Sequence, residues 1–217
     1  MGSIYDQIDL NPPKKQRSGE RVAIPVGNHG NKTTAALKIV KYLGERPTQA
    51  DPELVQYGFL VGLESGADGT AFFNLKLKEA WLTPEAVALA FNLVSPSVEA
   101  GLTTGAKIAE AQKQFLEVAE NRAIKNNTPE TELEKATETG YDNQMTQIRI
   151  NVGTLFRLQE WAGVGRSTTF NPAAFEGVKF AASVEPGFKG DTTEIKTVFS
   201  KAKAKAEATV VAEEVPY

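Results

Sequence analysis

The sequence predicts a mainly β fold with a helical insertion, in which five strands form a small barrel and helices lie between the third and the fourth strand. Two observations support this α+β arrangement. Apolar and polar residues alternate with a period of two before residue 79 and again after residue 176, which is typical of strands with one buried face. Between about residues 83 and 163 the apolar residues recur at helical spacing. One domain with an insertion is therefore expected in this chain of 217 residues.

Three consecutive strands are expected in the N-terminal half. The first covers residues 33–43, and Gly44 is expected to end it. The second covers residues 55–63 and carries two glycines opposite its apolar side, which suggests a bend or a close approach. Turn-forming residues at 65–69 lead into the third strand, residues 70–78, which alternates regularly. These strands would form an antiparallel meander.

The period changes at Thr83, a helix N-cap followed by proline, which predicts a helix through about Leu93. A second helix is expected over 104–126, and a short third one after Thr128, again with proline at its start. Residues 144–162 place apolar side chains at helical spacing and are assigned to a helix, although five residues within them could pass for a strand.

Two further strands are expected at 177–184 and 192–199, joined by a turn rich in Gly and Pro. Five strands with helices between the third and the fourth is the arrangement of an OB barrel, so the fold is predicted to be OB-like. The expected organisation is a basic N-terminal arm at 1–21, an OB-like domain at 22–200 with its helical insertion at about 83–163, and a flexible tail at 201–217.

The composition excludes several classes of protein. The chain has no Cys and one His, which rules out a disulfide framework, a thiolate nucleophile and a His-rich metal cluster. No apolar run approaches the ~20 residues of a spanning helix, so a soluble, cytoplasmic protein without membrane contact is expected. The net charge of −3 argues against a uniformly basic coat, but bases gather locally, as a nucleic-acid groove requires.

The stretch from Gly27 to Thr34 is similar to a phosphate-binding loop, but its spacing fails because Asn31 stands where glycine should precede Lys32. A nucleotide-using enzyme is therefore disfavoured. No acid pair stands out as a hydrolase or two-metal site, since most carboxylates fall at helix starts and on helical faces. We expect a protein that is not an enzyme and needs no cofactor or metal.

Bases and aromatic residues alternate on the predicted strands, and single-strand binding needs this combination, because cations follow the phosphates while rings stack on bases. Phe73 and Phe180 share a face with aliphatic residues and are assigned to the core. For Tyr42, Phe72 and Phe188, stacking and packing remain equally open. The candidate DNA-binding residues are Lys32, Lys38, Lys41, Tyr42, Phe72, Lys76, Lys78, Lys179, Phe188, Lys189 and Lys196.

The chain ends in an acidic and aromatic tip, Glu213, Glu214, Val215, Pro216 and Tyr217. This tip resembles the end of bacterial and phage single-stranded DNA-binding proteins, in which an acidic run precedes a branched aliphatic residue, proline and an aromatic residue. Tyr217 stands where that family usually has phenylalanine. The resemblance implies an OB fold, recruitment of replication and repair proteins by the tip, and competition between tip and DNA for the basic groove. A frayed terminus is the alternative.

The leading hypothesis is a sequence-independent single-stranded DNA-binding protein that acts in phage-type DNA replication, recombination or repair, in the host cytoplasm if phage-encoded. Its tip would recruit replication or recombination partners, and a homo-oligomer is left open. The alternative is a structural or assembly protein that oligomerises through the helical insertion.

Overall fold

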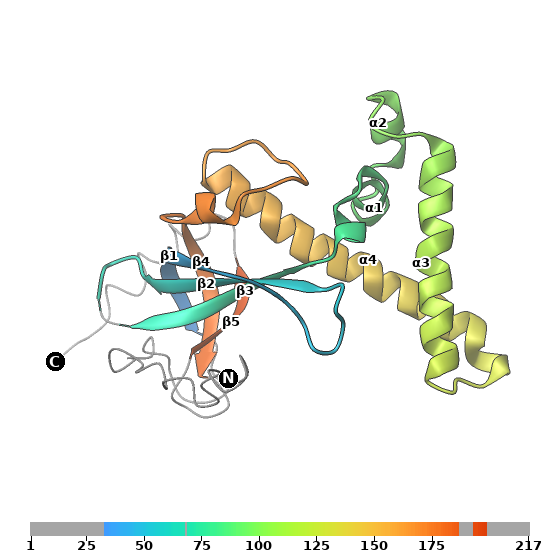
Figure 1. Ribbon diagram of the computed structural model, residues 1–217, viewed down its shortest axis with the longest axis horizontal. Helices are drawn as coiled ribbons and strands as arrows, with labels where there is room; N and C mark the ends of the chain where they lie inside the picture. Colours follow the sequence, from blue (N-terminus) through green and yellow to red (C-terminus); the bar gives the residue numbers. More distant parts are fainter. Residues whose placement is uncertain (1–32, 68, 187–192, 199–217) are drawn as a thin grey trace, which may run out of the picture.

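The computed structural model describes residues 33–67, 69–186 and 193–198 (Figure 1). The predicted arm at 1–21 and tail at 201–217 lie outside them. The elements, in chain order, are β1 (Thr33–Pro47), β2 (Val55–Leu63), β3 (Thr70–Leu77), the 3₁₀ turn η2 (Glu79–Leu82), α1 (Pro84–Ala90), α2 (Val94–Glu99), α3 (Gly105–Lys125), α4 (Glu130–Trp161), the 3₁₀ turn η3 (Pro172–Phe175), β4 (Lys179–Pro186) and β5 (Thr193–Val198).

The regular part of the sheet has four strands. β1 pairs antiparallel with both β2 and β4, and β2 pairs antiparallel with β3, so that the strands form a curled half-barrel in the order β3-β2-β1-β4. β5 pairs with β4 and meets β3 at one parallel residue pair, Phe72 with Glu194. That pair alone closes the ring β1-β2-β3-β5-β4.

The prediction of a five-stranded OB-like barrel is therefore wrong. The fold is α+β, built on a four-stranded antiparallel half-barrel with helices between β3 and β4. The reason for the error is physical. Alternation in a sequence indicates that a segment is extended with one face buried, but the number of residue pairs in each ladder depends on how the strands curl around the core.

β1 is longer than predicted, because Gly44 does not end it. Gly44 has φ +105°, and the pairing with β2 shifts register between Ile39 and Lys41 and again between Tyr42 and Gly44. Glycine adopts this left-handed backbone without steric cost, so the strand continues through a bulge to Pro47. The bulge region changes which side chains of β1 face outward.

The helices at 128 and at 144–162 are one helix, α4. Residues 148–152, which could have passed for a strand, lie in its middle. Gly140 does not break α4, because it faces α3 where the helices cross closely: a Cβ on Gly140 would lie 3.0 Å from the Cβ of Ala119. At the start of the insertion Thr83 caps α1 as predicted, its Oγ1 accepting from the backbone N–H of Ala86 at 3.2 Å.

One apolar core joins the sheet to α4. Phe59 and Phe73 from the sheet belong to the same buried cluster as Ile148 and Leu155 from α4, and Trp81 is buried beside them. In Figure 1, α4 runs from the sheet to α3, and the α1–α3 arm projects beyond the sheet. Among the described residues, no helix is both long and apolar enough to span a bilayer.

Candidate nucleic-acid interface

A shallow depression, called the trough below, crosses the outer face of β1, β2 and β3. The antiparallel register sets side chains of the three strands side by side in rows. From one end to the other, these rows are Arg46–Gln56–Lys76, Gly44–Gly58–Asn74, Lys41–Leu60–Phe72 and Lys38–Gly62–Thr70. A pocket within the trough has a volume of about 410 Å³ and is lined by Leu43, Gly44, Glu45, Arg46, Gln56, Gly58, Phe72 and Asn74.

The floor of the trough is open at Gly58. The backbone of Gly58 does not have a positive φ, so its conformation does not require glycine. Packing does not require it either, because the atoms nearest to a Cβ placed on Gly58 lie 3.7–3.8 Å away, an ordinary contact distance. A glycine inside a strand costs roughly 0.5–1 kcal/mol relative to alanine. What Gly58 provides is empty space above the middle strand.

Gly62, the other outward glycine of β2, differs from Gly58. A Cβ there would lie 3.4 Å from Cγ2 of Val40, and Gly62 is buried. The side chain of Val40 therefore covers that end of the floor. The depression is open mainly at Gly58.

Apolar walls and basic side chains border the trough. Phe72 of β3 is 39 % exposed on one side, and Leu43 of β1 is 48 % exposed on the other. The exposed bases are Lys41 and Arg46 on β1 and Lys76 on β3. A ring beside a floor that lacks a side chain at Gly58, bordered by cations, can hold a flat aromatic group next to an anion.

The structure brings four of the predicted residues together on this face: Lys38, Lys41, Phe72 and Lys76, all of them exposed. Lys179 is their neighbour, opposite Lys38 across β1 and β4, but its Nζ lies 3.0 Å from a carboxylate oxygen of Glu64. Part of its charge is therefore already compensated.

Tyr42 packs inward, which decides between the two roles left open for it. Its ring centroid lies 5.5 Å from that of Phe59, and its backbone N–H donates to Oε1 of Glu176 at 2.8 Å. Burial, followed by the charge of Glu45, raises the pKa of the Tyr42 hydroxyl. The register shifts of β1 bring this ring to the core side. Phe72, by contrast, faces outward.

Lys78 is not part of the trough. β3 ends at Leu77, and the ammonium of Lys78 lies 2.6 Å from a carboxylate oxygen of Asp51 and 3.5 Å from one of Glu53. The hydrogen bond from Lys78 is the main cause that lowers the pKa of Asp51, against an opposing effect of burial. These two ion pairs connect the loop between β1 and β2 to the residue that follows β3.

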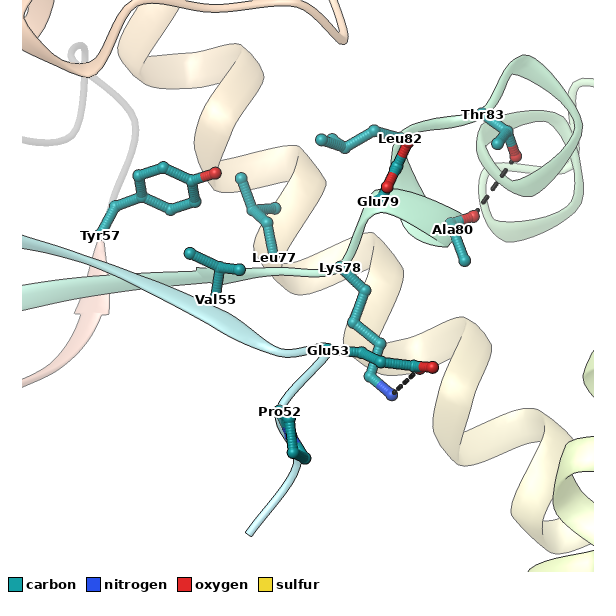
Figure 2. Close-up of a pocket in the computed structure, with 10 residues that line it drawn as sticks. All are labelled: Pro52, Glu53, Val55, Tyr57, Leu77, Lys78, Glu79, Ala80, Leu82 and Thr83. Atoms are coloured by element: carbon teal, nitrogen blue, oxygen red, sulfur yellow. Dashed lines mark hydrogen bonds and ion pairs between the residues drawn. The ribbon is translucent and has the colours of Figure 1, made fainter. Parts of the chain in front are cut away.

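Lys78 also borders a larger hollow of about 770 Å³, shown in Figure 2. The hollow lies between Pro52 and Glu53 on one side and residues 79–83 on the other, and the ring of Tyr57 reaches it from β2. In the described part of the chain, no group of three or more His, Cys, Asp or Glu side chains could hold a metal ion. The lining combines apolar side chains with two carboxylates, Glu53 and Glu79.

Lys32, Phe188 and Lys189 lie outside the described residues, as do the tip residues 213–217. Lys196 lies in β5. Sequence reasoning missed Arg46 because the strand was expected to end at Gly44. It missed Leu43 because alternation from the buried Leu37 and Ile39 places that side chain inside, whereas the register shifts of β1 leave it exposed. A signal was present, since glycine in a strand often marks a bulge rather than an end.

Comparison with known proteins offers no relative from which a role could be transferred. No family model matches the chain, and neither the curated proteins nor the solved structures gave a match. Function is therefore inferred from the trough itself.

We predict that Lys78→Met lowers the free energy of unfolding by up to about 1 kcal/mol at pH 7, because Asp51, whose side chain is 26 % exposed, loses its cation. The folded pKa of Asp51 is depressed, so the contribution of the pair is present above the unfolded value of about 3.9 and disappears as pH falls through the folded value. Urea unfolding near pH 7 and near pH 2 measures this difference. An unchanged deficit at the lower pH would contradict the assignment.

Proposed function

We propose that this protein is not an enzyme and binds single-stranded DNA, largely without regard to sequence, through the trough. The observation that carries the proposal is the open floor at Gly58, bordered by Phe72 and by cations from β1 and β3. Neither backbone conformation nor packing accounts for that glycine. A ligand that needs the space accounts for it.

The chemistry of the trough favours a single strand. Phe72 offers a ring on which any base can stack, while Lys41, Arg46 and Lys76 lie where phosphates would pass. β1 and β3 are two strand spacings apart, about 10 Å, which suits one extended chain of bases. A duplex keeps its bases inside the stack, so it cannot offer them to Phe72.

We predict that Gly58→Ala and Gly58→Val weaken binding to oligo-dT progressively, by about tenfold or more for valine, because the side chain fills the floor. The melting temperature should not fall, since both residues suit a strand interior better than glycine.

Phe72→Ala should cost ~1–3 kcal/mol of binding through lost stacking. Fluorescence anisotropy with labelled oligo-dT, run beside thermal unfolding, measures both quantities.

Lys78→Met is the matched control, because it removes a cation outside the trough and should leave oligo-dT affinity unchanged. Wild-type affinity should also fall log-linearly with salt, with a slope of about 0.7 per phosphate contacted, and duplex should bind far less well. Equal affinity for duplex and single strand, or a Gly58→Val variant that binds as well as wild type, would overturn the proposal.

The proposed setting is phage-type DNA replication, recombination or repair in the host cytoplasm, with residues 213–217 recruiting partner proteins. The sequence of the tip supports this part, because acidic residues precede a proline and a tyrosine. Removing 213–217 should tighten oligo-dT binding at low salt, because a competing negative charge is lost. Tyr217→Ala, which keeps the charges, should leave DNA affinity unchanged but abolish capture of replication proteins. No change in either assay would refute a role for the tip.

A second candidate is an assembly protein that oligomerises through its helical insertion. Asn92 and Gly101, both with positive φ, close α1 and α2, and the next residues, Leu93 and Leu102, donate their N–H groups back to the helices. Apolar residues at this position usually pack on their helix. Here Leu93 is 43 % and Leu102 67 % exposed.

Under the second candidate, wild type self-associates in sedimentation velocity, and a variant with Leu93→Ser and Leu102→Ser is a monomer. Burial of both leucines between copies would drive the association. Single-strand affinity would then be absent. A monomeric wild type excludes this candidate.

A further inference from the structure

Two oxygen atoms lie beside the position that a side chain on Gly58 would occupy. The carbonyl oxygen of Gly44 and Oδ1 of Asn74 each lie 3.7 Å from the point where a Cβ on Gly58 would stand. They come from the two strands that flank β2, so they border the floor from opposite sides. The floor of the trough thus has two hydrogen-bond acceptors beside Gly58.

The orientation of the Asn74 amide is set by its neighbour. Nε2 of Gln56 donates to Oδ1 of Asn74 at 2.9 Å, across β2 and β3. An amide oxygen has two lone pairs, so this bond leaves capacity for a second donor. The carbonyl of Gly44 likewise has two lone pairs.

The walls allow a flat group to enter this space edge-first. The Cβ of Leu43 lies 3.8 Å from the same point above Gly58, and Phe72 lines the opposite side of the depression. A base between these two side chains would place its faces against carbon atoms and its edge on the oxygens. The edge that fits best is one that carries N–H donors.

We propose that the floor at Gly58 is a slot for one base and that it prefers cytosine and adenine, which carry their amino group at C4 and C6, over uracil and thymine, which carry a carbonyl oxygen at C4. The amino group of cytosine donates two hydrogens, whereas thymine presents a carbonyl oxygen at the same position. That oxygen would face two acceptors. The inference rests on the proposed single-strand binding and adds a preference at one nucleotide of an otherwise sequence-tolerant contact.

Oligo-dC and oligo-dU are the probes for the test, because the two bases have the same size and neither carries the thymine methyl group. Wild type should bind oligo-dC about fivefold more tightly, the worth of roughly one net hydrogen bond. Asn74→Leu should lower the ratio of the two dissociation constants toward one, because only the carbonyl oxygen of Gly44 remains as an acceptor, with the melting temperature as a check on folding. Asn74→Asp keeps the acceptor, so the ratio should persist while the added negative charge weakens binding of both probes.

Equal binding of oligo-dC and oligo-dU by wild type would overturn the slot and leave the proposed function standing. A preference that Asn74→Leu leaves undiminished would overturn it too, since Asn74 would then take no part in reading the base. Failure to bind either probe would refute the proposed function and the slot together. Both titrations are run near pH 8, so that cytosine stays unprotonated.

Discussion

The packing of Phe59 is the contact on which the rest of the sheet depends. Its ring lies 5.5 Å from that of Tyr42, 5.8 Å from Phe73 and 6.1 Å from Phe175, measured between centroids. These neighbours come from β1, β3 and η3, so one buried ring on the middle strand joins three other segments. Such aromatic contacts contribute about 0.5–1.5 kcal/mol each beyond the area they bury. The packing of the inner face therefore stabilises β2, and its outer face does not need large side chains for stability.

A strand with a filled inner face can carry glycine outside without losing its place in the sheet. Phe59 and Val61 are fully buried, so the hydrophobic set of β2 specifies the register even though Gly58 and Gly62 add no side-chain contacts of their own. The trough is the consequence. Because the buried inner face stabilises the strand, its outer face can lack side chains at Gly58 and Gly62.

The bulge in β1 gives the trough its chemical character. By turning Tyr42 into the core it removes a ring that sequence alternation places outside, and by continuing β1 past Gly44 it brings Arg46 opposite Gln56 on the outer face. Glu176 supports this geometry through its hydrogen bond to the backbone of Tyr42. Phe72 and Arg46 therefore border a floor whose shape is set by backbone irregularity in the neighbouring strand.

Much of this protein can be read from local sequence patterns. Alternation and capping predict the bounds of β2, the core positions Phe73 and Phe180, the cap at Thr83 and the exposure of Lys38 and Lys76, because these depend on residues close together in the chain. The exposure of Lys41 depends instead on the bulge in β1. Local patterns do not predict four other features: the curled four-stranded sheet, the single helix α4 in place of two, the pairing of Lys78 with Asp51 and the row Gly44–Gly58–Asn74. Only the tertiary structure decided these, because a cross-strand neighbour is determined by register, and register depends on bulges and on packing between segments far apart in the sequence.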